Sequence, residues 1–294
     1  MKTSIATVSI SGELPEKLEA IAKAGFSGVE IFENDFLAFD GSPADVGKMA
    51  RDFGLEITLF QPFRDFEGMP EPYRTRVFDR AERKFDVMQE LGTDLVLICS
   101  NLSPVSLGGI DRAADDFREL GERAAKRGLK VGYEALAWGR HISDHRDAWE
   151  VVRRADHPNV GLILDSFHTL SRNIDPKSIV SIPKDKIFFV QLADAPKIDM
   201  DLLYWSRHFR NMPCEGDLDG DTEVVRHEAE DATHAGRIVH HVDAVDEHSA
   251  FVRFEQRRHH PDRRRLAGAV RADETEDFAP RDVEAQIVQH LHRP

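Results

Sequence analysis

The stretch Asp144–His168 reads DHRDAWEVVRRADHPNVGLILDSFH, and it decides the fold. Its first half has the apolar spacing of a helix, which predicts a helix over Asp144–Ala155. Three turn residues follow, and an unbroken apolar run then predicts a buried strand over Val160–Asp165. A helix, a turn and a strand therefore form one unit, and the strand ends on a carboxylate, Asp165.

The same unit recurs along the chain. Strands are predicted to begin near residues 3, 29, 56, 95, 130, 160 and 187, so the spacing is 26 to 39 residues. Strands that alternate with helices at this spacing form parallel βα units, and this repetition predicts an α/β fold, the (β/α)8 TIM barrel. An open doubly wound sheet is the alternative, but it usually carries a glycine-rich loop after its first strand, and Ser9–Gly12 matches that loop poorly.

The last quarter of the chain differs in residue usage. Residues 220–294 contain eleven arginines, no lysine and nine of the fourteen histidines. We therefore expect a catalytic barrel domain over 1–219 and a divergent, partly disordered Arg/His-rich tail over 220–294, for which a shifted reading frame is one hypothesis. The eighth βα unit is accordingly predicted to be atypical or missing. The nearest candidate for a strand is Arg237–Val242, and without it the first and seventh strands would keep unpaired edges.

Composition excludes several classes of protein. The net charge of −14 argues against a protein that coats nucleic acid, because such proteins carry basic faces. No apolar run reaches the roughly 20 residues that span a bilayer, and the N-terminus lacks the apolar region of a signal peptide. The two cysteines imply no disulfide framework. We expect a cytoplasmic protein that acts on a small molecule, without nucleic-acid or membrane partners, and we leave a homo-oligomer open.

Polar side chains end several of the predicted strands. Glu134, Asp165 and Gln191 end three successive strands, and in a TIM barrel such ends carry the active site. Oxygen donors of this kind suit a hard divalent cation such as Mg²⁺ or Mn²⁺. The alternative is a set of ordinary loop-facing polar residues or a pair of carboxylates that share a proton. Glu30 and Glu33 are weaker candidates, and for them we expect a salt bridge at the barrel end.

Two further features indicate acid–base chemistry and an anionic ligand. His168 follows a strand end, where a histidine can move protons; the alternative is a packing role. Tyr204–Arg210 mixes aromatic, hydroxyl and cationic side chains, which suits a small ring-shaped carboxylate, since arginine binds carboxylates with two hydrogen bonds. The alternative is an amphipathic helix with solvated arginines. The cationic set on these loops comprises Arg64, Arg207, His208 and Arg210.

Residues 1–219 also resemble a known family, the bacterial 3-dehydroshikimate dehydratases of the sugar-phosphate-isomerase-like (xylose-isomerase-like) TIM-barrel superfamily. The resemblance covers about three-quarters of the chain and rests on long motifs that occur in order. These motifs are EIFEND at 30–35, QPFRDFEG at 61–68, YEALAWG at 133–139, LDSFH at 164–168, FVQLADAP at 189–196 and SRHFR at 206–210.

The resemblance implies a lyase that converts 3-dehydroshikimate to protocatechuate in quinate and shikimate breakdown. It implies a divalent metal, Mg, Mn or Co, that polarises the ketone and is held by Glu134, Asp165 and Gln191. It further implies His168 as the base that takes an α-proton, with Glu134 as a second catalytic residue. The residues that would hold the substrate carboxylate and hydroxyls are Arg64, Ser206 and Arg210.

The family pattern has a fourth ligand, a glutamate on strand eight, and residues 220–294 contain no matching strand end. His240, His241 and Glu247 are the candidate substitutes. Two alternative functions therefore stay open. One is a sugar isomerase or epimerase of the same superfamily, and the other is a catalytically impaired barrel that lacks its last metal ligand.

Overall fold

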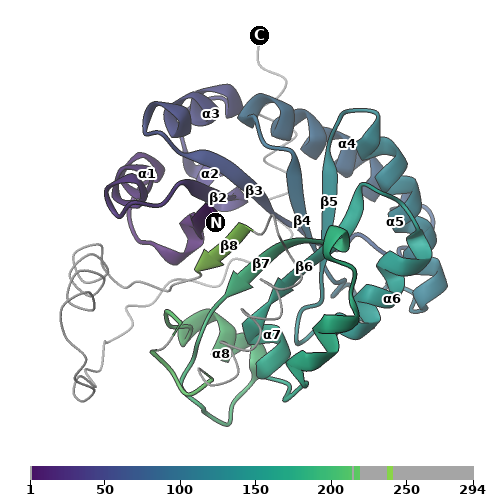
Figure 1. The fold of residues 1–294 in the computed structure, drawn as a ribbon. Coiled ribbons are helices and arrows are strands. Elements are labelled where there is room, and N and C mark those ends of the chain that lie inside the picture. The colour runs from purple at the N-terminus through teal and green to yellow at the C-terminus, as the bar shows by residue number, and fades with distance from the viewer. Residues whose placement is uncertain (1, 214, 219–236, 241–294) are drawn as a thin grey trace. The chain divides into compact units, whose positions relative to one another are not determined.

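The computed structural model describes residues 2–213, 215–218 and 237–240. The contacts divide the chain into two compact units, 1–254 and 255–294, and all described residues lie in the first. That unit is a closed barrel of eight parallel strands in sequential order, as Figure 1 shows. The strands are β1 (Lys2–Ala6), β2 (Gly28–Phe32), β3 (Glu56–Phe63), β4 (Leu95–Cys99), β5 (Lys130–Glu134), β6 (Val160–Asp165), β7 (Ile187–Leu192) and β8 (Arg237–His240).

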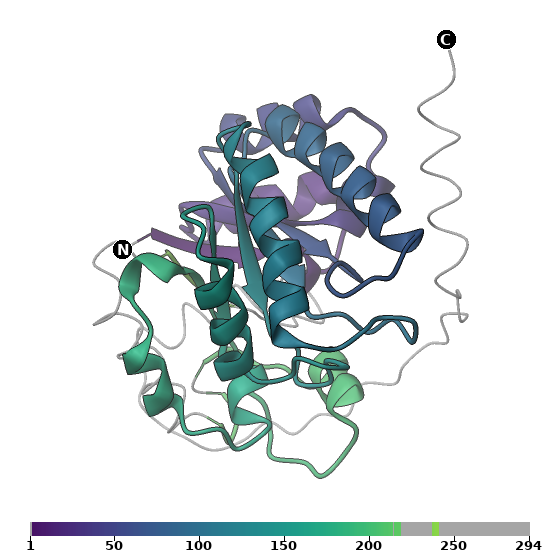
Figure 2. The same cartoon turned by 90° about the vertical axis from the view of Figure 1, so that its right-hand side faces the viewer.

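Helices lie alongside the strands and form the outer layer (Figure 2). They are α1 (Leu14–Lys23), α2 (Glu33–Ala38), α3 (Pro43–Asp52), α4 (Tyr73–Leu91), α5 (Ile110–Ala125), α6 (His145–Ala155), α7 (Ser166–Leu170) and α8 (Leu202–His208). Short 3₁₀ turns are η1 (Thr7–Ser9), η2 (Pro176–Ser181) and η3 (Lys184–Lys186). Among the described residues, every helix is too short or too polar to span a bilayer.

Local sequence signals explain where these helices begin and end. At the start of α3, the Ser42 hydroxyl accepts a hydrogen bond from the Asp45 N–H at 3.2 Å, and the Asp45 carboxylate accepts one from the Ser42 N–H at 2.9 Å. This reciprocal pair satisfies two N–H groups that the helix leaves open. At the end of α4, Gly92 has a φ of 81°, a left-handed conformation that glycine adopts without strain.

The core has two layers because successive strand residues point to opposite faces. The larger cluster joins strand residues such as Val96 and Ile98 to apolar side chains of the surrounding helices. A second cluster takes the alternate positions, including Leu95 and Leu97 of the same strand, and fills the barrel interior. Both layers are built by the continuous apolar runs that identified the strands in the sequence.

The eighth strand closes the barrel. Ile238 pairs with Thr3 of β1 and with Val190 of β7, so both neighbouring edges are occupied. The candidate strand within Arg237–Val242 is therefore confirmed over four residues, and the open edges that its absence would have left on β1 and β7 do not arise. β8 lies inside the segment predicted as a tail, and the domain boundary at residue 219 stays a prediction. The predicted substitutes His241 and Glu247, like the side chain of His240, lie outside the described part of the structure.

Candidate metal and substrate site

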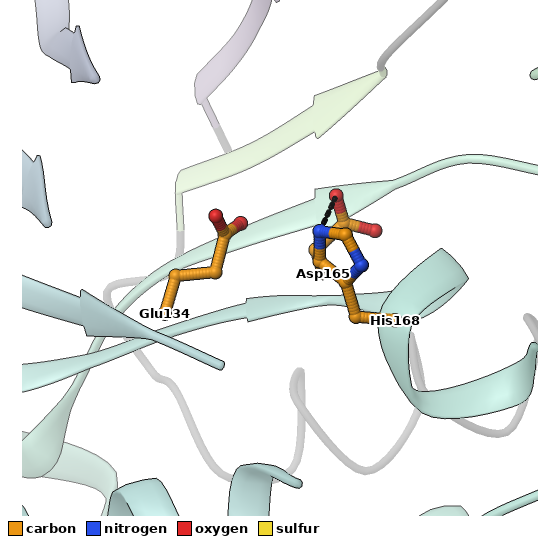
Figure 3. A group of neighbouring side chains, drawn as sticks. All are labelled: Glu134, Asp165 and His168. Carbon is orange, nitrogen blue, oxygen red and sulfur yellow. Dashed lines mark ion pairs between the residues drawn. The ribbon is translucent and has the colours of Figure 1, made fainter. Parts of the chain in front are cut away.

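Three side chains that could bind a metal converge at the carboxyl ends of β5 and β6. Glu134 ends β5, Asp165 ends β6, and His168 lies in α7, which begins directly after β6. All three are buried, and one ligand atom of each lies within 4.8 Å of the others (Figure 3). The two carboxylates predicted from the strand ends therefore lie together in the structure, and His168 lies beside them.

The short helix α7 explains why His168 turns back toward Asp165. One oxygen of Asp165, Oδ1, accepts a hydrogen bond from the Phe167 N–H at 2.8 Å, so Asp165 caps α7 at its N-terminus. The turn that follows brings Nε2 of His168 to 3.8 Å from the other oxygen, Oδ2. The same Oδ2 accepts a hydrogen bond from Nη1 of Arg210 at 2.6 Å.

The electrostatic environment of Glu134 disfavours its charge. Burial raises the pKa of Glu134 to about 8, and the nearby charge of Asp165 adds to this shift. The Cys99 thiol donates to Glu134 Oε2 at 3.6 Å, which is a weak hydrogen bond. Two buried carboxylates side by side are unfavourable unless a proton or a cation separates them.

Gln191, the third predicted ligand, lies next to Asp165 in the sheet register. The nitrogen of its side-chain amide is hydrogen-bonded to Glu30, not to Asp165. Its Nε2 donates to Oε2 of Glu30 at 2.6 Å, and Gln61 Nε2 donates to the same oxygen at 2.8 Å. Oε1 of Glu30 is buried and has no hydrogen-bond partner among the described residues. Burial raises the pKa of Glu30 to about 8.

Glu30, which the sequence offered only as a weaker candidate, therefore lies in this site. The predicted salt bridge at the barrel end is confirmed for Glu33, which pairs with Lys84, and is wrong for Glu30. The sequence signal that could have found Glu30 is its place inside a strand whose neighbours are all apolar. A charge at such a position is buried and needs a specific partner.

The hydrogen bonds of His168 indicate which ring nitrogen carries its proton. The Ala137 N–H, which can only donate, points at Nδ1 of His168 at 3.2 Å. Nη2 of Arg210, which can also only donate, lies 3.4 Å from Nε2, so donors face both ring nitrogens. The Ala137 contact is the shorter of the two, and with Nδ1 as its acceptor the neutral imidazole carries its proton on Nε2. Burial lowers the pKa of His168 to about 4, so the ring is neutral near pH 7. In this tautomer Nε2 presents a proton and not a lone pair.

The predicted substrate-binding residues divide into an inner and an outer group. Ser206 and Arg210 are buried, and Nε of Arg210 donates to the Ser206 hydroxyl at 3.0 Å. Arg207 and His208 of α8 are exposed, as the amphipathic-helix alternative predicted. Arg64 is exposed after β3, and its charge is near enough to lower the pKa of Glu134.

The residues present fit a divalent cation. The cluster offers the two carboxylates of Glu134 and Asp165, and Gln191 ends the strand next to Asp165. Glu30 adds a buried carboxylate oxygen without a partner among the described residues. Oxygen-rich sets of this kind are typical of Mg²⁺ and Mn²⁺ sites, and a cation would stabilise the charged form of carboxylates whose pKa values are raised by burial and by mutual repulsion.

Comparisons with known proteins agree with this fold. Two curated relatives named 3-dehydroshikimate dehydratase, from Pseudomonas aeruginosa and Pseudomonas putida, are 64% and 63% identical over 219 residues. The match covers 74% of this chain and 34% of each relative, so the chain spans about a third of their length.

A solved structure of a xylose isomerase-like TIM barrel/4-hydroxyphenylpyruvate dioxygenase fusion protein is 57% identical and has a TM-score of 0.78. The match covers 81% of this chain and 38% of that protein. A family model described as a xylose isomerase-like TIM barrel matches residues 18–253, which is most of the chain. The chain therefore belongs to the xylose isomerase-like TIM barrel family.

Proposed function

We propose that this chain catalyses the dehydration of 3-dehydroshikimate to protocatechuate, with a divalent metal as cofactor. The observation that carries the proposal is the buried cluster of Glu134, Asp165 and His168 with Arg210 beside it. The high identity to relatives named 3-dehydroshikimate dehydratase supports the choice of substrate.

Glu134, Asp165 and Gln191 would hold the metal, as the sequence predicted. A bound divalent cation supplies Lewis-acid polarisation of the substrate ketone, which makes the neighbouring C–H more acidic. His168 stays outside this set in our assignment, because the tautomer that Ala137 selects has a proton on Nε2 and leaves no lone pair there for a metal.

Arg64 and Arg210 would bind different groups of the substrate. Arg64 lies exposed at the barrel end and would receive the substrate carboxylate, for which a guanidinium is well shaped. Arg210 is buried between Ser206 and Asp165, and it would orient the substrate hydroxyls while it holds Asp165 in place. The ring of Trp138 lies 5.0 Å from that of His168 and limits the freedom of the imidazole.

The reaction removes an α-proton and expels a hydroxyl group as water, and aromatisation of the ring then makes it favourable. His168 in its other tautomer, with a lone pair on Nε2, would take the α-proton, the role predicted from the sequence, and the imidazolium so formed would give that proton to the departing hydroxyl. The ring is then neutral again when water leaves, and Glu134 is the alternative acceptor of the α-proton. That other tautomer loses the hydrogen bond from Ala137.

The test is to incubate the protein with 3-dehydroshikimate and Mg²⁺, Mn²⁺ or Co²⁺ and to follow protocatechuate by its ultraviolet absorbance. We expect product only with metal, and we expect loss of product when a chelator is added. Conversion of a sugar substrate without any protocatechuate would favour the isomerase or epimerase alternative. Metal binding without turnover would favour the impaired barrel, since β8 lacks a glutamate.

A further inference from the structure

The carboxylate of Glu30 joins parts of the barrel that are not neighbours in the sheet. Glu30 lies on β2 and is fully buried. It accepts hydrogen bonds from Gln61 on the adjacent strand β3 at 2.8 Å and from Gln191 on β7 at 2.6 Å. Since β7 pairs with β6 and β8, the bond to Gln191 crosses the barrel interior. The catalytic roles proposed above leave this carboxylate unused.

The bond to Glu30 determines how the Gln191 carboxamide is oriented. A carboxamide carries a donating nitrogen and an accepting oxygen on one carbon, and the two atoms diverge. Oε2 of Glu30 accepts from two amide nitrogens, and a proton on this carboxyl group would lie on the other oxygen, Oε1, so Oε2 holds the nitrogen and repels the oxygen in either protonation state. With Nε2 held at 2.6 Å from Glu30, Oε1 of Gln191 is directed away from Glu30. Without that carboxylate, either end of the amide could occupy the position.

Gln191 lies beside Asp165 in the sheet, so its orientation bears on the metal site. A metal binds the oxygen of an amide and not its NH₂ group. We propose that Glu30 is a positioning residue that fixes the Gln191 carboxamide with its oxygen available to a cation held by Glu134 and Asp165. Carboxylates that orient a metal-binding side chain in this way are a recurrent feature of metal sites. The inference rests on the proposed function, because it assumes that Gln191 is a ligand.

The test is a double-mutant cycle on the full chain, with Mn²⁺ affinity measured by isothermal titration calorimetry. The variants are Glu30→Asp, Gln191→Ala and the double variant, and Glu33→Gln is the control from the same segment. Glu30→Asp keeps the carboxyl group but withdraws it from Gln191. We expect Glu30→Asp to weaken Mn²⁺ binding about 10–100-fold, and Glu33→Gln to leave it unchanged. The double variant should bind no more weakly than Gln191→Ala alone.

The outcomes separate this inference from the proposed function. Unchanged Mn²⁺ affinity in Glu30→Asp, or effects that simply add in the double variant, would overturn the role through Gln191 while leaving the metal site intact. Failure of the unmutated protein to bind Mn²⁺ would overturn both.

A measurement on the unmutated protein covers the case in which a variant does not fold. With glutamine side chains labelled with ¹⁵N, we expect slow hydrogen exchange of the Gln191 carboxamide in both metal-free and Mn²⁺-bound states. Exchange at the rate of an exposed amide would contradict the hydrogen bond to Glu30.

Discussion

Carboxylates cluster on the outer surface of α4 and α5 and also at the carboxyl end of the barrel, but the two environments shift carboxylate pKa values in opposite directions. On the outer surface, Glu119 accepts hydrogen bonds from Arg74 and Arg123, each at 2.7 Å, and Arg127 donates to Glu82 at 2.8 Å. Although partial burial raises the pKa of Glu119, these bonds outweigh it, and the net pKa is lowered.

At the barrel end the balance is reversed. Burial raises the pKa of Glu30 and of Glu134 to about 8, and Arg210 is the guanidinium that bonds directly to this cluster, through Asp165. Charges that are half exposed and paired cost little, whereas buried charges that lack a counterion destabilise the fold. The difference indicates that the barrel end is arranged for a cation and a substrate, and the outer surface for holding helices together.

The largest expected effect concerns the two histidines that flank β6. His168 lies just after this strand and His157 just before it. We expect His168→Ala to lower kcat by about 10²–10⁴-fold, because it removes the proposed proton-transfer group. The matched variant His157→Ala should retain turnover, since its side chain lies at the other end of the strand. Undiminished turnover in His168→Ala, measured by protocatechuate formation, would end the assignment.

The next largest effect is expected from Arg210, which is buried just after α8, in comparison with Arg207, which is exposed on α8. Arg210 donates to Ser206 and Asp165 and lies over the Phe167 ring, 4.6 Å from its centroid. A lysine cannot reproduce these contacts, so we expect Arg210→Lys to lower kcat/KM by roughly 10–100-fold. Arg207→Lys on the exposed side of α8 should leave kcat/KM unchanged. Equal losses in both variants would mean that charge alone, and not position, decides binding.

A smaller effect concerns Glu67, a buried carboxyl outside the proposed metal set. It accepts hydrogen bonds from the Asn101 N–H at 2.6 Å and from the Tyr133 hydroxyl at 2.9 Å, yet burial raises its pKa to about 7. A carboxyl whose pKa is higher in the folded state stabilises the fold fully below its unfolded pKa. That stabilisation is lost as the pH rises through the folded value.

Between about pH 6.5 and pH 8, Glu67 should therefore cost the fold about 1 kcal/mol of unfolding free energy. The opposite contribution of His168, whose pKa is lowered from 6.5 to about 4, grows as the pH rises from about 4 and is complete only about one unit above 6.5, and it is the same with and without the Glu67 substitution. In urea unfolding of the metal-free protein, Glu67→Gln should lose less stability across this range than the unmutated protein. A pH dependence that Glu67→Gln leaves unchanged would show that Glu67 does not titrate there.

The smallest effect is expected on the outer surface. Arg127 contacts Glu82 and Asp86 of α4, and all three side chains are partly exposed. Removing one partner of an exposed ion pair costs less than about 1 kcal/mol, so Arg127→Ala should change the urea midpoint only slightly. A loss of more than about 2 kcal/mol in unfolding free energy would contradict the contrast between the outer surface and the barrel end.

The sequence predicted the fold well, because its signals are local. Apolar runs and turn residues identified the strands β1 to β7, and apolar spacing identified the helix α6, predicted over Asp144–Ala155 and observed over His145–Ala155. The helix α2 over Glu33–Ala38 was missed, since it follows directly on a strand and buries no residue fully.

The candidate site was predicted only in part, for a physical reason. Strand periodicity indicates which side chains share the end of the barrel, and so it placed Glu134 and Asp165 together. It does not indicate contacts across the interior, such as the bond between Glu30 and Gln191, or the path of the loop that brings Arg210 onto Asp165. Those contacts depend on the closed barrel as a whole.

The central claim is that the buried carboxylates of the barrel end hold a divalent cation, and titration of the full chain with Mn²⁺ tests it most directly. Asp165→Asn is the variant of choice, because asparagine still caps α7 while the charge is lost. Asp175→Asn, at the N-terminus of η2, is the matched control, since Asp175 also caps a turn. We predict one Mn²⁺ per chain, an affinity at least about 100-fold weaker in Asp165→Asn, and no change in Asp175→Asn. The absence of Mn²⁺ binding, or equal binding in Asp165→Asn, would contradict the claim.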